Sequence, residues 1–208
     1  MATGQTHEQP ELEARDPDVR RMLRVRDDAP GAFEELVVAY QARLLGVLAH
    51  LIGRGDEAED LAQEVFLRIY KARKGYRPTA KFSTWLFTIA NNVALNYLRG
   101  KGRNPTQALG GNGADTSSIR PVVASRDASA SAQMRQVELA DVVREAMEEL
   151  GEDQRMAVLL NKFEEMSYAD IAMVMGRTEA AVKSLLARAR NNLRERLEPY
   201  LRTGQRGS

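Results

Sequence analysis

The side chains that could do chemistry in this chain are suited to binding rather than to catalysis. The sequence has no cysteine and only two histidines, His7 and His50. This composition excludes disulfides, thiolate nucleophiles and thiolate zinc sites, and it supports neither a Ser-His triad nor a histidine metal site. We therefore expect no catalytic residue, no metal and no cofactor. The remaining polar clusters are candidates for binding sites.

One cluster combines acidic and amide side chains with a leucine. Asp60, Gln63, Glu64 and Leu67 have the spacing i, i+3, i+4, i+7, so on a helix they form a single stripe opposite the apolar side. A leucine among acids predicts a protein-contact surface, because burying it against a partner removes apolar area from water. The alternative is a solvated acidic face with a stray leucine. A metal site is less favoured, because two carboxylates without histidines or a second acidic helix bind metal poorly.

A second cluster carries amides where a surface helix usually carries charge. Asn92, Asn96 and Arg99 share one helical face with Thr88. An asparagine offers both a donor and an acceptor to a base edge. The preceding segment, residues 74–82, interleaves basic side chains with aromatic ones, a combination that suits an unstacked single strand. The aromatic residues could instead belong to the core, the interpretation favoured for Trp85.

The most specific pattern covers residues 168–185. Ser167 with Asp170 forms a capping box, Ala172 permits close approach of two helices, and Gly176 permits a left-handed turn between them. This spacing predicts a helix-turn-helix whose second helix turns Lys183, Ser184 and Arg188 outward, where a recognition helix meets base edges. The alternative is an ordinary helical hairpin with a basic face.

Charge is distributed in blocks, although the net charge is only +1. Residues 65–114 contain nine basic side chains and no acidic one, residues 138–170 contain ten acids against three bases, and residues 177–196 contain six bases against two acids. Such blocks favour two separate surfaces for a polyanion, flanked by acidic surfaces for another partner. Chance clustering on solvated faces is the alternative.

Apolar residues recur at helical spacing through most of the chain and show no useful strand alternation. The pattern predicts an all-α fold of two small helical domains joined by a flexible linker. The expected parts are a flexible tail at 1–28 with a short helix near 19–25, a three-helix domain at 29–103 whose third helix is capped by Ser83, a linker at 104–134, a helix-turn-helix domain at 135–201, and a disordered tail at 202–208.

The linker contains Gly, Ser, Ala, Thr, Asp and two prolines and shows no sustained period. Its relaxed span of about 30 Å and extended reach of about 100 Å allow the domains to occupy distant sites. The longest apolar run, residues 44–49, is far shorter than a membrane span needs, and glutamates stand where a signal peptide has its apolar core. We expect a cytoplasmic protein without membrane insertion.

Two blocks of sequence resemble a known family. AEDLAQEVFLRIY (58–70) and FSTWLFTIANNVALNYLRG (82–100) resemble conserved region two of bacterial sigma-70 factors, in their compact extracytoplasmic-function (ECF) group. LGEDQRMAVLLNKFEEMSYADIAMVMGRTEAAVKSLLARARNNLRERL (150–197) resembles region four of the same group. With the leading helix, the resemblance covers about residues 31–103 and 136–198, in the family's order and without room for a region-three domain.

The resemblance implies binding to the RNA polymerase core, recognition of promoters and help in opening DNA. It implies that Asp60, Gln63, Glu64 and Leu67 bind the clamp helices of the largest polymerase subunit. The residues implied in holding the downstream promoter element as a melted strand are Lys74, Arg77, Lys81, Phe82, Asn92, Asn96 and Arg99. Those implied in binding the upstream element as duplex are Thr178, Lys183, Ser184 and Arg188. Many members of the family carry arginine at the position of Leu185, and aspartate is common at the position of Asn96. These two differences affect the promoter sequence to be expected, and not the class of protein.

An anti-sigma partner is also implied, because the group is commonly held by one. Two other classes of protein remain as rivals. A stand-alone helix-turn-helix regulator would bind duplex DNA without polymerase. A helical metal-dependent hydrolase would lose its activity when Asp60 is replaced, and would contain metal.

Overall fold

The computed structural model describes residues 8–53, 55–103 and 130–203, and over these ranges the chain contains helices and no strand. The elements are α1 (Glu8–Arg15), α2 (Pro17–Arg26), α3 (Ala32–Ile52), α4 (Asp56–Ala72), the 3₁₀ turn η1 (Arg73–Gly75), α5 (Phe82–Arg103), α6 (Ala130–Glu148), α7 (Glu152–Lys162), α8 (Tyr168–Met175) and α9 (Glu179–Thr203). The predicted all-α fold class is confirmed.

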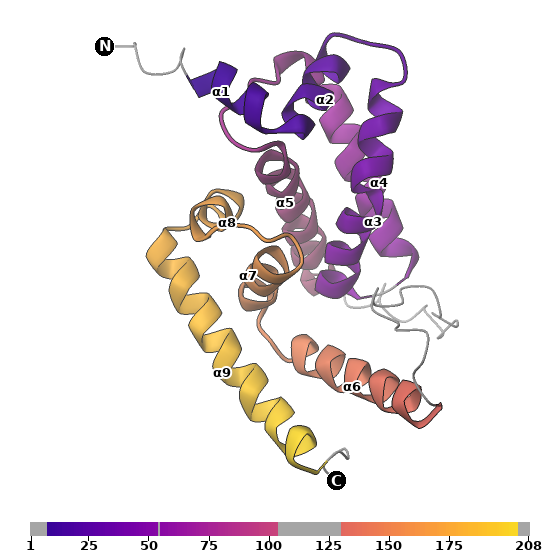
Figure 1. Cartoon of the computed structure of the whole chain (residues 1–208), viewed down its shortest axis with the longest axis vertical. Helices are drawn as coiled ribbons and strands as arrows, with labels where there is room; N and C mark the ends of the chain where they lie inside the picture. Colours follow the sequence, from indigo (N-terminus) through magenta and orange to yellow (C-terminus); the bar gives the residue numbers. More distant parts are fainter. Residues whose placement is uncertain (1–7, 54, 104–129, 204–208) are drawn as a thin grey trace.

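Helices α3, α4 and α5 form the core of the first half, residues 8–103, as Figure 1 shows. On α3 the buried side chains Leu36, Tyr40, Leu44 and Leu48 recur every four residues and are at most 1% exposed. This helix is long and apolar enough to cross a membrane by length and composition. Its contacts with α2, α4 and α5 instead identify it as a core helix.

The N-terminal segment differs from the predicted flexible tail. Residues 8–26 form α1 and α2, and Val19 and Met22 of α2 have no exposed area. Asp16 caps α2, because its carboxylate accepts hydrogen bonds from the backbone N–H groups of Asp18 and Val19. The predicted short helix near 19–25 lies within α2, but the predicted flexibility of 8–26 was wrong, because four buried apolar side chains on α2 dock it against α3.

The second half, residues 130–203, contains helices α6 to α9. α6 begins at Ala130, before the predicted domain boundary at 135, and most of the predicted linker lies outside the described residues. α7, α8 and α9 share buried apolar residues that include Leu159, Ile171 and Val182. The last helix continues to Thr203, into the segment 202–208 that was predicted as a tail.

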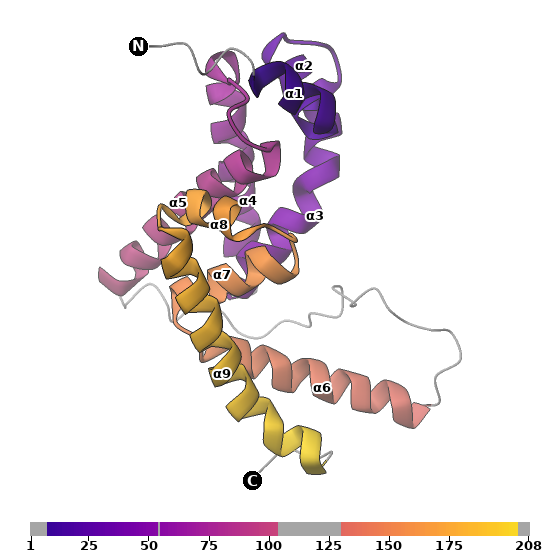
Figure 2. The same ribbon diagram turned by 60° about the vertical axis from the view of Figure 1, so that its left-hand side comes forward.

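The two halves are in contact. α7 packs against α3, and α8 packs against α5 (Figures 1 and 2). Their buried residues form one continuous apolar cluster. The sequence predicted two domains but not this contact between them.

Candidate protein and nucleic-acid interfaces

The acidic stripe of Asp60, Gln63, Glu64 and Leu67 lies on the solvent side of α4. The opposite side of the helix is buried through Ala58, Ala62, Val65, Phe66 and Ile69, which turns the stripe outward. Leu67 is 46% exposed, and Glu64 pairs with Arg68 one turn later at 2.7 Å. Among the described residues, His, Asp and Glu side chains form no group of three or more that could hold a metal ion.

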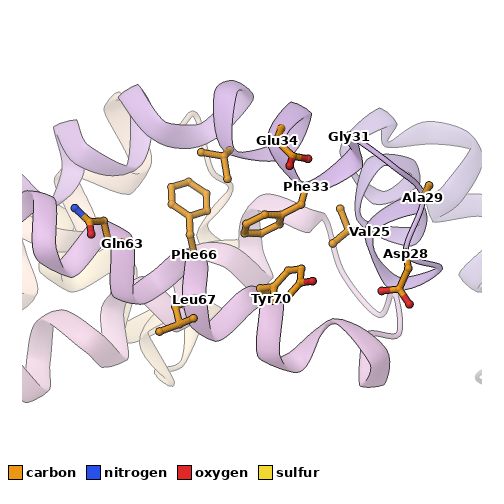
Figure 3. Close-up of a pocket in the computed structure, with 11 residues that line it drawn as sticks. Val25, Asp28, Ala29, Gly31, Phe33, Glu34, Gln63, Phe66, Leu67 and Tyr70 are labelled. Atoms are coloured by element: carbon orange, nitrogen blue, oxygen red, sulfur yellow. The ribbon is translucent and has the colours of Figure 1, made fainter.

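Beside this stripe lies an apolar groove of about 600 Å³ between the start of α3 and the middle of α4 (Figure 3). We call it the α3–α4 groove. Gln63, Phe66, Leu67 and Tyr70 supply one wall, and the other is supplied by Val25, Ala29, Phe33 and Val37. The exposed apolar surface therefore continues from Leu67 beyond the four predicted residues.

Two aromatic rings face each other in the middle of the groove (Figure 3). The rings of Phe33 and Tyr70 lie 4.9 Å apart, and the guanidinium of Arg73 lies 3.9 Å above the Tyr70 ring. Arg73 also donates to Asp28 at 3.0 Å. Sequence reasoning missed Phe33 and Tyr70 as surface residues because helical periodicity assigned both to buried stripes.

Asp28 also binds Lys74, at the start of the predicted strand-binding loop, residues 74–82. Lys74 donates to the Asp28 carboxylate, and to the carbonyl oxygen of Arg26 at 2.8 Å. The hydrogen bonds from Lys74 and Arg73 hold the pKa of Asp28 below its ordinary value, so the carboxylate stays charged. Lys74 is thus oriented by α2, whereas the side chain of Arg77 is exposed.

The aromatic side chains of this loop face inward. Phe82 has no exposed area, and its ring lies 5.9 Å from Trp85 and 6.3 Å from Tyr76. The Phe82 backbone N–H donates to the Asp16 carboxylate at 3.0 Å. The buried ring cannot stack on a base in this structure, because it fills the core beside α2. The proposed stacking role of Phe82 therefore does not fit the structure.

The other predicted strand-binding residues of α5 face outward. Asn92, Asn96 and Arg99 are exposed on one side of the helix, and we call them the asparagine face. Arg99 donates to the Asn96 side-chain oxygen at 3.3 Å. Lys81, just before the helix, donates to Asp170 of α8 at 3.2 Å.

Helices α8 and α9 have the local geometry that the sequence predicts. The Ser167 hydroxyl accepts from the Asp170 backbone N–H at 3.1 Å, as expected for a helix cap, and donates to the Asp170 carboxylate at 2.7 Å. Gly176 ends α8 in the left-handed conformation, with φ 60° and ψ 39°. The bend lets α9 cross α8, with Val182, Leu185 and Leu186 buried between them.

The outer face of α9 carries the predicted duplex-binding residues. Lys183, Ser184 and Arg188 are exposed. Thr178 has a structural contact as well, because its hydroxyl accepts from the Ala181 backbone N–H at 3.2 Å at the start of the helix. Arg177, in the turn that precedes α9, forms an exposed ion pair with Asp153 of α7 at 2.5 Å, a kind of pair that contributes little to stability.

Comparison with known proteins gives two matches to one family. The model of Sigma-70 region 2 matches residues 36–104, and the model of Sigma-70, region 4 matches residues 140–193. The RNA polymerase sigma-H factor of Pseudomonas aeruginosa is 35% identical over 186 residues, which cover 89% of this chain and 96% of the relative. The ECF RNA polymerase sigma-E factor of Escherichia coli K12 is 32% identical over 188 residues, covering 86% and 93%.

Two solved structures have a similar fold. The sigma factor RpoE of Bartonella quintana, in complex with the anti-sigma factor NepR, has a TM-score of 0.61 and 26% identity, and the match covers 81% of this chain and 98% of that one. CnrH, in complex with the cytosolic domain of CnrY, has a TM-score of 0.63 and 21% identity, and the match covers 88% and 99%.

Proposed function

Because this chain belongs to the sigma-70 family and is an RNA polymerase sigma factor of the ECF type, we propose that it docks on core polymerase through α4 and contacts promoter DNA through α5 and α9. In this proposal the acidic stripe and the α3–α4 groove together form the polymerase surface. The observation that carries it is the exposed Leu67 at the junction of the stripe with the groove.

A protein partner fits this surface better than a small molecule does. Leu67 is 46% exposed although an apolar groove lies beside it, so a partner that covers both would remove a continuous apolar area from water. Asp60 and Glu64 flank this area and can select a basic or hydrogen-bonding partner surface. We propose that this partner is the clamp helices of the largest polymerase subunit, as the family resemblance implies.

The two DNA surfaces belong to different halves of the chain. We propose that α5 holds the downstream promoter element as a melted strand, because its exposed side chains are amides able to bond bases that have left the stack. α9 suits the major groove of the upstream element, since its exposed Lys183, Ser184 and Arg188 follow a helix-turn-helix bend.

The proposal also includes the setting of the protein. We infer a non-enzymatic initiation factor that acts in the cytoplasm, where its polymerase and DNA partners are. An anti-sigma protein is a further proposed partner, supported by the fold that this chain shares with a sigma factor solved in complex with one.

Gel filtration with core polymerase tests the docking surface. The full chain should elute with the core enzyme, and Leu67→Ala should weaken this association about tenfold, as expected for loss of a central apolar anchor. Leu201→Ala is the matched control, because Leu201 is 72% exposed but lies on α9. Equal affinities of both variants would remove Leu67 from the interface, and binding to duplex DNA without any association with core would favour a stand-alone regulator.

A further inference from the structure

Helix α8 of the helix-turn-helix packs against α5 next to the asparagine face. Thr84 and Asn91 of α5 are 3% and 5% exposed, and both donate hydrogen bonds to this part of the second half. The contact thus covers a side of α5 that adjoins Asn92, one residue further along the helix. It also engages Lys81, a proposed contact to the melted strand.

Asp170 is the centre of this contact. One carboxylate oxygen accepts from the Thr84 hydroxyl at 3.1 Å, and the other accepts from the Lys81 ammonium at 3.2 Å and the Ser167 hydroxyl at 2.7 Å. Burial opposes ionisation, but the hydrogen bonds from Ser167, Lys81 and Thr84 outweigh it and lower the pKa of Asp170. A desolvated carboxylate with three donors is an oriented site rather than a chance surface pair.

Other contacts hold the halves in the same arrangement. Asn91 donates its side-chain N–H to the carbonyl oxygen of Val174 at 3.4 Å. Arg43 of α3 donates to Glu164 at 3.0 Å, and the Glu164 side chain is only 2% exposed. Arg155 of α7 donates to the carbonyl oxygen of Leu51 at 3.1 Å, at the end of α3.

The chemistry of the contact resembles that of a bound strand. A phosphate is an anion that a lysine binds through its ammonium group, and here the Asp170 carboxylate takes that place beside α5. The acidic block of residues 138–170 also supplies Glu164, which binds Arg43 of the first half. A strand that runs along the asparagine face towards Lys81 would meet the side of α8 and its negative charge.

We propose that α8, through Asp170, competes with the melted strand for α5, so that the free protein is held closed by a contact between its own halves. The proposal rests on the proposed function of α5. Opening requires the hydrogen bonds of Asp170 with Lys81 and Thr84, and that of Asn91 with the Val174 carbonyl oxygen, to be exchanged for contacts with DNA or polymerase. This exchange couples strand binding to separation of the halves. Asp170 therefore controls the equilibrium between the closed and the open protein.

Fluorescence energy transfer within the full chain measures the closed state. The natural sequence contains no cysteine, so Val38→Cys on α3 and Glu198→Cys on α9 give two unique labelling positions, both exposed. Asp170→Asn removes the charge and keeps the backbone N–H that Ser167 caps. Thr84→Val removes one donor at nearly constant volume and changes no proposed DNA contact. Each should raise the open population about tenfold, the equivalent of one charge-assisted hydrogen bond.

Asp153→Asn is the matched control. It removes the same charge from the second half, but Asp153 pairs with Arg177 of that half and not with α5. It should leave the energy transfer unchanged. Thermal unfolding of each variant separates opening from loss of structure.

Strand binding gives the second readout. The probe is a fluorescent pool of random single-stranded DNA of about 12 nucleotides, with the same pool as duplex for comparison. Asp170→Asn and Thr84→Val should bind the single strand more tightly by a factor of several, because less binding energy is used to open the protein. Duplex affinity should be unchanged.

The results separate the two proposals. If wild-type protein binds no single strand while Asp170→Asn still opens it, the closed state stands and the strand-binding role of α5 fails. If both variants leave energy transfer and strand affinity as in wild type, or if Asp153→Asn opens the protein equally, the Asp170 contact is not a latch and the inference is overturned.

Discussion

At the scale of single residues, the two helices that we propose to contact DNA, α5 and α9, should respond differently to loss of one side chain. Arg188 on α9 and Asn92 on α5 are both exposed, and we propose that Arg188 contacts duplex DNA whereas the Asn92 amide contacts an unstacked base. Arg188→Ala should weaken binding to the upstream element by about 1–3 kcal/mol if the arginine is bidentate to a guanine. Asn92→Ala should leave that binding intact and impair the downstream element and strand opening.

Three promoter templates check this division: duplex, premelted at the downstream element, and altered in either element. A premelted template should lessen the opening defect of Asn92→Ala without restoring its base preference. If both variants give one profile on all three templates, the two helices contribute only general affinity.

Two buried tyrosines allow a comparison between a core hydroxyl that has a hydrogen-bond partner and one that has none. The Tyr40 hydroxyl donates to Asp18 at 2.6 Å, whereas the buried Tyr76 hydroxyl has no partner among the residues that the structure describes. Tyr40→Phe should cost about 1.5–3 kcal/mol of unfolding free energy, because one oxygen of the Asp18 carboxylate loses its donor while the other keeps Arg21. Tyr76→Phe should be neutral or stabilising. Urea unfolding measures both, and equal losses would contradict this difference.

Because the same two tyrosines are buried, the protein should lose stability at alkaline pH. Burial raises the pKa of both Tyr40 and Tyr76 above the ordinary value of about 10. The folded state therefore keeps protons that the unfolded state releases, so this contribution is complete below about pH 10 and is lost as pH rises further. Urea midpoints at about pH 8 and about pH 11 should show a smaller decrease for Tyr40→Phe than for wild type. An equal decrease would contradict this source of alkaline instability.

At the scale of elements, the turn between α8 and α9 depends on one glycine. Gly176 has a φ of 60°, and a Cβ there would meet no atom within 4 Å, so only backbone strain opposes a side chain. Gly176→Ala should cost about 1–2 kcal/mol and weaken duplex binding through α9. Gly75→Ala is the control, because its Cβ also meets nothing and its φ is not in the left-handed region. Thermal unfolding that ranks the two variants equally would contradict this explanation.

Much of the secondary structure could be predicted from the sequence, because α3, α4, α5 and α9 each have an apolar side of their own. The ends of α8 were also predictable, since Ser167, Asp170 and Gly176 act on their neighbours in the chain. α2 was harder, because twelve charged residues in 1–28 hide its short buried stripe. Its start signals, Asp16 before Pro17, were present in the sequence.

The candidate site was predictable where exposure follows from helical periodicity, as for Leu67 and Asn92. Phe82 was not, because a sequence pattern does not tell an aromatic ring that stacks on a ligand from one that packs on Tyr40 at 5.1 Å. The groove needed the structure for a similar reason. Phe33 and Tyr70 lie on different helices, so their contact depends on the tertiary structure.

At the scale of the whole molecule, contacts between the halves join residues far apart in sequence. Lys81 and Asp170 are separated by 89 positions, so no helical spacing in the sequence indicates that they are in contact. The Arg43–Glu164 pair has the same character, and burial of Glu164 raises its pKa despite the hydrogen bond from Arg43. The arrangement of the halves thus needs a structure to be seen.

Arg43→Gln should destabilise the joined halves in a pH-dependent way. Glu164 would then be buried without its cation, at a cost of about 1–3 kcal/mol near neutral pH. A carboxyl with a raised folded-state pKa adds most stability below its unfolded value of 4.5, and that stability is lost as pH rises through the folded value. Urea unfolding should show a smaller deficit at about pH 5 than at about pH 7. A deficit independent of pH would contradict this role of Glu164.

Runoff transcription with purified core polymerase on a genomic promoter library tests the central claim most directly. Core enzyme with this chain should produce transcripts from a defined set of promoters that share an upstream and a downstream element, and core enzyme alone should not. Leu67→Ala should reduce these transcripts at limiting protein, whereas Leu201→Ala should not. A transcript set that is the same with and without the chain would contradict the assignment of this molecule as a promoter-directing subunit.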